Sequence, residues 1–280
     1  MNIKMIEASC YHCDTAKRNK YDEENGFVLW KCVGCGLLYV SPRPKNSEIK
    51  ESTEEGVFFG KRKLNVLYGF KRKKISKFIG ILNEIYSDKN LEGSWLDIGA
   101  GYGEFMNALN IYFTNLHTIE GLEPSRVKLK EAKRRGIYIK YNGLNDICIK
   151  YNYVSLLNVY SHLSNPVLEI NKIKKKLLPG GELLLQTGDV CDLPINQQSK
   201  PYFLPNHLSF ASEKIVTNIL TKLGFEIVNI KKYRAPELPE RSIFGLTKQL
   251  LKLMHPNKRA SFRFFENKNT DMWIRARNKE

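Results

Sequence analysis

An apolar strand that runs directly into a glycine-rich turn is the sequence feature that most restricts the fold of this chain. The segment 95–105 reads WLDIGAGYGEF, and its glycines are Gly99, Gly101 and Gly103. Glycine permits a tight turn and lets a ligand approach the amide groups at the start of the following helix. Nicotinamide enzymes use a related turn, Gly-x-Gly-x-x-Gly, but here the third glycine comes one residue early. We therefore expect a strand, a turn and a helix that together present backbone amides to a ligand.

Predicted strands and helices alternate beyond residue 93, which indicates a parallel sheet with helices on both faces. The expected strands are 94–98, 118–122, 137–141, 153–157 and 181–186, followed by a strand pair at 225–233 and 272–277. The expected helices are 103–113, 125–135, 166–177 and 212–223, the last with Ser212 as its N-cap. An insertion at about 236–270 contains a basic amphipathic segment, 243–254, that we interpret as a lid, a dimer surface or a membrane contact.

Four cysteines form two identical Cys-x-x-Cys pairs, Cys10 with Cys13 and Cys32 with Cys35. In a reducing compartment such pairs are typical of metal ligands rather than disulfides. Two such turns can close a tetrahedral four-thiolate zinc site, which has no open position and braces a small domain without performing chemistry. We expect His12 to be exposed because four thiolates already complete the site. The remaining cysteines, Cys148 and Cys191, are interpreted as buried or incidental.

These features divide the chain into three parts. We expect a zinc ribbon at 1–44, a linker with an amphipathic helix at 45–92, and the main domain at 93–280. Ser41-Pro-Arg-Pro44 ends the ribbon, because two prolines stop a strand and favour an extended linker. Apolar residues three and four positions apart predict the helix from Lys61 to about Tyr86, with Gly69 as a place where it could break.

Composition says less about partners. Lys and Arg total 45 against 29 Asp and Glu, a formal net charge of +16, and a basic surface attracts phosphates. The chain is also rich in Asn, Ile and Tyr, a bias that arises without any polyanionic partner, so we favour a solvated lysine-rich surface. No stretch approaches the roughly 18 apolar residues of a membrane helix, and the start lacks a signal-peptide apolar region. We expect a cytoplasmic protein.

Several motifs, taken in order over about residues 93–234, resemble a class I S-adenosylmethionine-dependent methyltransferase. The matching segments are Asp97–Gly103, Leu122–Ser125 with Glu131–Lys133, Tyr151–His162 and Leu177–Leu185, which contains Leu-Pro-Gly-Gly. The resemblance implies an α/β, Rossmann-like sheet, mostly parallel with one antiparallel edge strand. It also implies S-adenosylmethionine as the methyl donor.

The donor carries a sulfonium cation, an amino group and a ribose, so its pocket should supply carboxylates and carbonyls. Glu123, about 20 residues after the glycine turn, is placed to accept the ribose hydroxyls. Asp97 would hold either the glycine turn or the amino group. By analogy the adenine lies near 143–146, with Asn145 or Asp146 beside its exocyclic amine. The full set of expected donor-binding residues is Asp97, Gly99, Ala100, Gly101, Gly103, Glu123, Leu144, Asn145 and Asn158.

Two positions depart from the family pattern. Asn152 and Asn158 stand where many relatives have acidic residues. Both keep hydrogen bonding but remove charge, so donor binding should survive while an acid/base role at these positions becomes doubtful.

Methyl transfer is an in-line displacement, so alignment supplies much of the acceleration. A hydroxyl acceptor usually needs a base, whereas a neutral amine needs less help. The candidates are His162, after the fourth strand, and His207, in the loop before residue 212. A lone histidine is more often structural, so the sequence leaves open which of the two, if either, is the base.

The ribbon, the linker, the core and the segment Pro205–Phe210 together resemble bacterial methyltransferases of surface-polysaccharide or secondary-metabolite pathways, whose acceptors are nucleotide-linked sugars or glycan ends. Related deoxysugar C-methyltransferases carry a further C-terminal domain, so we favour O-methylation and keep N-methylation open. One alternative is an RNA base methyltransferase, which the charge suits, although those enzymes typically include histidine among their zinc ligands. Another is a non-catalytic protein that retains the fold. The acceptor and the oligomeric state stay open.

Overall fold

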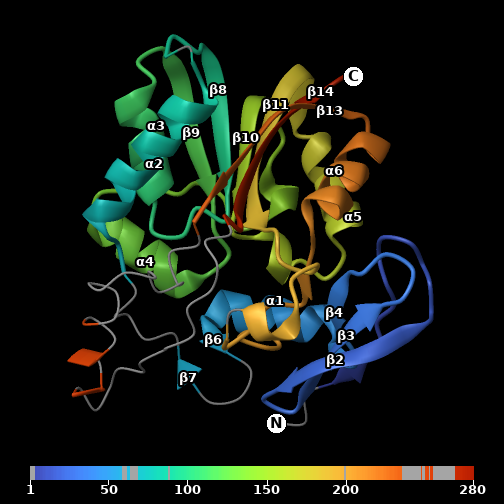
Figure 1. The fold of residues 1–280 in the computed structure, drawn as a ribbon. Helices are drawn as coiled ribbons and strands as arrows, with labels where there is room; N and C mark the ends of the chain where they lie inside the picture. Colours follow the sequence, from blue (N-terminus) through green and yellow to red (C-terminus); the bar gives the residue numbers. More distant parts are fainter. Residues whose placement is uncertain are drawn as a thin grey trace.

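A mostly parallel six-stranded sheet forms the centre of the protein, as seen in a computed structural model (Figure 1). The structure describes residues 4–58, 62–63, 69–87, 89–198, 200–234, 247, 250–251, 253–254 and 269–280. The strand order is β13-β14-β11-β10-β8-β9. The strands are β8 (Gly93–Ile98), β9 (Leu116–Leu122), β10 (Tyr151–Leu157), β11 (Leu177–Gly188), β13 (Phe225–Tyr233) and β14 (Asp271–Asn278). The first four pair in parallel, and β14 pairs antiparallel with both β11 and β13. The predicted Rossmann-like class is confirmed.

Helices cover both faces of this sheet. On one side lie α2 (Arg72–Ile85), α3 (Glu104–Tyr112) and α4 (Arg126–Arg134), and on the other lie α5 (Pro166–Lys174) and α6 (Glu213–Lys222) (Figure 1). Adjacent strand residues point to opposite faces, so on β8 Trp95 packs in the cluster beneath α2 and α3 while Leu96 joins the other core. Both side chains are fully buried. Full burial of an aliphatic side chain such as Leu96 stabilises the fold by about 1.5–3 kcal/mol.

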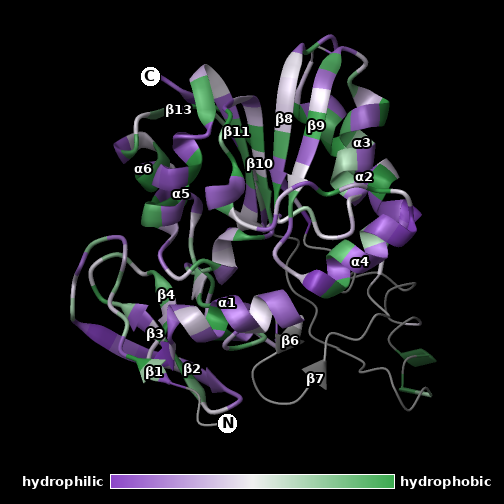
Figure 2. Ribbon diagram, turned by 180° about the vertical axis from the view of Figure 1, so that it is seen from behind, coloured by the Kyte–Doolittle hydropathy of each residue, from purple (hydrophilic) through white to green (hydrophobic). Residues whose placement is uncertain are grey.

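A second, smaller sheet lies next to the carboxyl ends of the parallel strands. It has the order β12-β4-β3-β2, built from β2 (Arg18–Glu24), β3 (Phe27–Cys32), β4 (Leu38–Val40) and β12 (Ser209–Phe210). The first three strands belong to the ribbon, but β12 comes from the main domain, and Ser209 is paired with Tyr39. The edge strand β2 is largely hydrophilic (Figure 2), which discourages pairing with another chain. Ribbon and main domain therefore share one sheet and one hydrophobic core.

Several predicted elements differ from the structure near residues 41–86. Arg43 and Pro44 are buried and form β5 (Arg43–Pro44), which pairs with β1 (Met5–Ile6), so this segment is packed rather than a solvated linker. A helix, α1 (Asn46–Glu55), follows where we expected none and ends at Gly56, whose φ of 67° only glycine adopts easily. The helix predicted from Lys61 begins only at Arg72; before it, β6 (Val57–Phe58) pairs with β7 (Arg62–Lys63), and residues 64–68 lie outside the described part.

Other corrections concern the main domain. The segment 137–141 is not a strand, because only Tyr141 forms a bridge, to Leu122. The helix predicted to 177 ends at Lys174, since β11 already begins at Leu177. Ser212 occupies the N-cap position of α6, but its hydroxyl makes no capping bond; instead the Asp189 carboxylate accepts from the Glu213 amide at 2.9 Å.

Most of the predicted insertion lies outside the described residues, so the interpretation of segment 243–254 stays a prediction. Within the part of the chain that the structure describes, no helix is long and apolar enough to cross a membrane.

Candidate active site at the carboxyl ends of the strands

The glycine turn links β8 to α3, as predicted. All three of its glycines have positive φ: 77° at Gly99, 60° at Gly101 and 83° at Gly103. A Cβ on Gly99 would stand 2.3 Å from Cγ2 of Val159, and one on Gly103 would stand 2.5 Å from Cγ2 of Ile137. At Gly101 the nearest atom would be 3.9 Å away. Packing thus excludes side chains at the first and third glycines, whereas the middle one borders open space that a ligand can enter.

Glu123 ties this turn to the end of β9. Its side chain is almost fully buried, with Oε2 accepting from the Gly101 amide at 2.8 Å and Oε1 from the Ser125 amide at 2.9 Å. The Lys128 ammonium lies 3.5 Å from Oε2. A carboxylate offers about four lone-pair sites, so this one keeps capacity for a ligand hydroxyl. The buried Ser125 hydroxyl nearby has no hydrogen-bond partner among the described residues.

Asp97 lies one residue before the end of β8 and is also buried. It accepts a hydrogen bond from the Ser155 hydroxyl at 2.6 Å, and the structure shows none between its carboxylate and the glycine turn. Burial raises the pKa of the Asp97 carboxyl to about 7, against the lowering effect of Ser155. The negative charges of Glu123 and Glu104 add to the rise. A cation beside Asp97 would restore its ionised form.

The expected adenine-binding residues lie on a short 3₁₀ turn, η2 (Leu144–Asp146). Asn145 is exposed and Leu144 is half-buried. Asp146 instead holds its own turn, because its carboxylate accepts from the Gly143 amide at 2.9 Å. Of the two residues expected beside the exocyclic amine of the adenine, only Asn145 does not use its side chain to hold its own turn, so that side chain stays available to a ligand.

The two asparagines at family-acidic positions lie at opposite ends of β10. Asn158 follows the carboxyl end, is exposed and has a φ of 56°, a strained conformation that is common at functional sites. Asn152 lies at the amino end, where its side-chain oxygen accepts from the Ser94 amide at 2.9 Å. Asn152 is therefore far along the strand from the glycine turn, and the loss of an acid there does not affect this site.

His162 and His207 are brought together, with ring centroids 4.6 Å apart. His162 ends the 3₁₀ turn η3 (Tyr160–His162), and its Nδ1 lies 2.7 Å from the Asn206 carbonyl oxygen. The Nδ1 of His207 lies 2.8 Å from the Tyr202 carbonyl oxygen. Carbonyl oxygens only accept, so each Nδ1 carries the proton and each Nε2 presents a lone pair.

Both imidazoles are held neutral. Burial, followed by the neighbouring His207, lowers the pKa of His162 to about 3. Burial likewise lowers the pKa of His207. The pair connects directly to the glycine turn, because the His162 amide donates to the Val159 carbonyl at 2.9 Å and Val159 packs on Gly99. Val159 and Ser155 are site residues that the sequence analysis missed. The only sequence signal for Ser155 is its position in β10, where alternate side chains point to opposite faces of the sheet.

The four ribbon cysteines converge on one point. Their Sγ atoms all lie within 4.8 Å of one another, and none forms a disulfide. Three of the six Sγ–Sγ distances are 3.4 Å, 3.5 Å and 3.7 Å, close to the edge of about 3.8 Å expected for a tetrahedron with Zn–S bonds of about 2.3 Å. Gly36, with a φ of 80°, completes the second turn.

The other cysteines and His12 fall outside this cluster. The expectation that His12 is exposed is wrong. Both of its ring nitrogens are buried, and neither has a hydrogen-bond partner among the described residues. Cys148 is exposed, and Cys191 is buried.

A family model for a methyltransferase domain matches residues 70–230. A search of the curated proteins finds no match. Among solved structures, an S-adenosylmethionine-dependent methyltransferase from Archaeoglobus fulgidus superposes with a TM-score of 0.52 at 16% identity, over 74% of this chain and 95% of the other.

Two further structures have the same fold. One is an S-adenosylmethionine-dependent methyltransferase from Mesorhizobium loti, with a TM-score of 0.51 and 12% identity over 71% of this chain and 96% of the other. The second is the [4+2]-cyclase SpnF, with a TM-score of 0.50 and 14% identity over 83% of this chain and 92% of the other. At such identity the likeness establishes the fold alone.

Proposed function

Because this chain belongs to the methyltransferase-domain family and is a class I S-adenosylmethionine-dependent methyltransferase, we propose that it methylates a hydroxyl group of a sugar or glycan-type acceptor. The proposed setting is surface-polysaccharide or secondary-metabolite biosynthesis in the cytoplasm. The observation that carries the proposal is the pair of neutral histidines beside the glycine turn, each with Nε2 able to accept a proton.

The residues at the glycine turn fit the donor. S-adenosylmethionine, when bound, supplies a methyl group on a positively charged sulfur. The open side of Gly101, with Ala100 and Gly103 in the same turn, would take its amino-acid part, and Asp97 would pair with the ammonium group. Glu123 would accept the ribose hydroxyls, and the unpartnered Ser125 hydroxyl nearby offers another polar contact. Leu144, Asn145 and Asn158 would border the rest of the donor.

The histidine pair accounts for a hydroxyl acceptor. One Nε2 would accept a hydrogen bond from the acceptor hydroxyl and take its proton as the methyl carbon passes from the donor's sulfur to the oxygen, which leaves the sulfur as a neutral thioether. Because burial keeps both rings neutral, an accepting lone pair is present at physiological pH. A pKa of about 3 makes His162 a weak base, so its role is to orient the acceptor hydroxyl, and His207 takes the proton. The carbonyls of Asn206 and Tyr202 fix the tautomers and orient the rings, and alignment supplies much of the acceleration.

We also propose that the four cysteines bind a structural zinc ion. Their spacing fits tetrahedral thiolate coordination, and four protein ligands leave no position for a substrate. Reduced cysteines of this kind suit a reducing compartment, which supports the proposed location.

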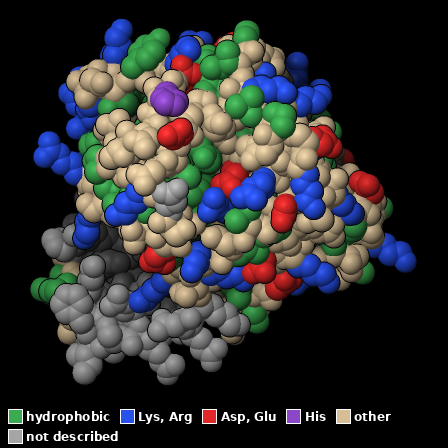
Figure 3. Space-filling view, turned by 90° about the horizontal axis from the view of Figure 1, so that it is seen from above, with side chains coloured by type: hydrophobic (Ala, Val, Ile, Leu, Met, Phe, Trp, Pro, Cys, Tyr) green, Lys and Arg blue, Asp and Glu red, His purple; other side chains and the backbone are tan. Residues whose placement is uncertain are grey.

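The alternative acceptor is an RNA base, which the net charge of +16 favours. Figure 3 shows the face at the amino ends of the parallel strands, opposite the candidate site, where Lys and Arg side chains are interspersed with Asp and Glu, so part of the positive charge lies away from the site. A neutral amine of a base also needs less help from a proton acceptor than a hydroxyl does.

The test is to incubate the purified protein with methyl-labelled S-adenosylmethionine and fractionated cell extract. We expect label in a sugar nucleotide or lipid-linked glycan fraction, stable to ribonuclease. Label that enters RNA would establish the alternative. A His162→Gln variant should leave the same fraction unlabelled while it still binds the donor.

A further inference from the structure

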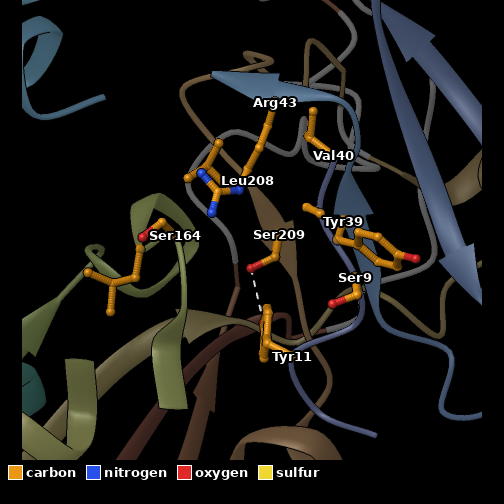
Figure 4. Close-up of a pocket in the computed structure, with 10 residues that line it drawn as sticks. Ser9, Tyr11, Tyr39, Val40, Arg43, Ser164, Leu208 and Ser209 are labelled. Carbon is orange, nitrogen blue, oxygen red and sulfur yellow. Dashed lines mark hydrogen bonds between the residues drawn. The ribbon is translucent and has the colours of Figure 1, made fainter. Parts of the chain in front are cut away.

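A small hollow lies between the ribbon and the main domain, next to the segments that follow the two histidines. Its volume is about 20 Å³, and its walls come from both parts of the chain (Figure 4). The lining residues used below are Ser9, Arg43, Ser164 and Ser209. Leu163 and Ser164 follow His162 in sequence, and Leu208 and Ser209 follow His207, so each histidine leads straight into a wall of this hollow.

Arg43 is a buried cation in this hollow without an acidic partner. Arg43 is only 8% exposed to solvent. Its Nη1 donates hydrogen bonds to the Pro44 carbonyl at 3.0 Å and to the Asn46 side-chain oxygen at 2.9 Å. Both acceptors are neutral, and no carboxylate among the described residues pairs with the guanidinium. Nε and Nη2 make no hydrogen bond within the described part, yet neither atom is fully enclosed. Arginine stays protonated even though burial lowers its pKa.

The rest of the hollow suits an anion. None of the ten lining residues is acidic. The hydroxyls of Ser9 and Ser164 make no hydrogen bond with a described residue, and Ser209 shares its hydroxyl with Tyr11 at 3.0 Å. Figure 4 shows the guanidinium reaching past Leu208 on the side of the hollow where Ser164 and Ser209 lie. A buried charge without a partner is energetically costly. The planar guanidinium can donate two parallel N–H bonds, which match two oxygens of a phosphate.

We propose that this hollow is an anchor for a phosphate group carried by the methyl acceptor, with the Arg43 guanidinium and the Ser164 hydroxyl as its donors. The inference rests on the proposed function and narrows its acceptor to phosphate-bearing sugars. A volume of about 20 Å³ holds one water-sized group, so one phosphate oxygen would enter the hollow while the rest of the phosphate and the sugar lie outside it.

The test measures binding of inorganic phosphate by calorimetry, and acceptor kinetics with labelled donor. Arg43→Gln should weaken phosphate binding by about tenfold or more, as expected for a lost charge-assisted contact, and should raise KM for the acceptor fraction far more than it lowers kcat. Arg43→Lys should recover part of the affinity. Arg18→Gln is the matched control, because Arg18 lies in the same ribbon but already pairs with Glu7 at 3.1 Å.

Two further arms separate the possible failures. Extract treated with a nucleotide pyrophosphatase together with a phosphatase, which removes phosphate from sugar nucleotides, should no longer serve as acceptor. Equal phosphate binding by wild type and Arg43→Gln, full activity of the treated extract, or transfer of label to a short RNA that displaces phosphate would overturn the proposal. Binding of S-adenosylmethionine, measured in parallel, shows whether the proposed function fails together with the phosphate anchor. If Arg43→Gln does not fold, phosphate binding and acceptor KM are compared instead between wild type and the Ser9→Ala, Ser164→Ala double variant.

Discussion

Gly99 and Val159 are packed so closely that a Cβ on Gly99 would stand 2.3 Å from the valine methyl Cγ2. The glycine turn and the 3₁₀ turn that carries His162 therefore pack directly against each other. In the proposed site, the donor and the proton acceptor would lie on the two sides of this contact, which is how the fold could align them.

Gly99→Ala should disturb both halves of the site. The added methyl must push Val159 away, and overpacking of this kind costs about 1–3 kcal/mol, so we expect donor affinity to fall by about tenfold and turnover to fall further. The control is Gly136→Ala, because Gly136 has a similar φ of 75° but nothing within 4 Å of an added Cβ. If both variants lose donor affinity equally, backbone strain and not the Val159 contact explains the effect.

Replacing the histidines should separate chemistry from donor binding. His162→Gln or His207→Gln should lower kcat by about 10²- to 10⁴-fold, the usual contribution of a general base, while the donor Kd changes little. His117→Gln serves as control, since His117 is exposed on β9. Single-turnover rates with labelled donor provide the measurement, and full rates in both variants would rule out a proton-accepting role for the pair.

Donor binding should depend on pH through Asp97. Its pKa of about 7 means that below neutral pH the carboxyl is protonated and must lose a proton to pair with the donor ammonium. Affinity should therefore rise with pH, by up to about tenfold per unit below pH 7, and level off above it. Asp97→Asn should bind more weakly and lose this component of the pH profile. Parallel profiles for the two proteins, obtained by calorimetry, would contradict the assignment.

Removing the proposed zinc ion should disturb the two histidines through Tyr11. This residue lies between Cys10 and Cys13, and its hydroxyl lies 3.3 Å from the Tyr160 hydroxyl and 3.0 Å from that of Ser209. Loss of the ribbon turn would release both histidine segments.

Cys32→Ser should accordingly lose bound zinc, melt at lower temperature and lose turnover, while the donor site at the glycine turn keeps more of its affinity. Exposed Cys148→Ser is the control. Metal analysis and melting curves check the result; a zinc-free protein with normal turnover would show that the ribbon does not support the site.

The local parts of this architecture could be predicted because their signals are local. The strand, turn and helix around Gly101 follow from neighbouring residues, and the two cysteine pairs need only their own spacing. The segment 137–141 has a strand-like composition, but only Tyr141 reaches a pairing partner. Helix α1 has no buried residue, so its sequence carried no apolar periodicity to detect.

Contacts between distant segments could not be predicted. The strand pairing of Ser209 with Tyr39 joins residues far apart in the chain and decides where His207 lies. The burial of Arg43 depends on the same docking of the ribbon, so its motif looked like a simple linker. Ring contact between His162 and His207 is likewise a product of tertiary structure.

Calorimetric titration of S-adenosylmethionine into wild-type protein and Glu123→Gln tests the central claim most directly. The account predicts saturable binding by the wild type and an affinity at least about tenfold lower in the variant, because the amide cannot accept from both backbone N–H groups and the ribose at once. A wild-type protein that binds no donor, or a variant that binds it equally well, would contradict the account.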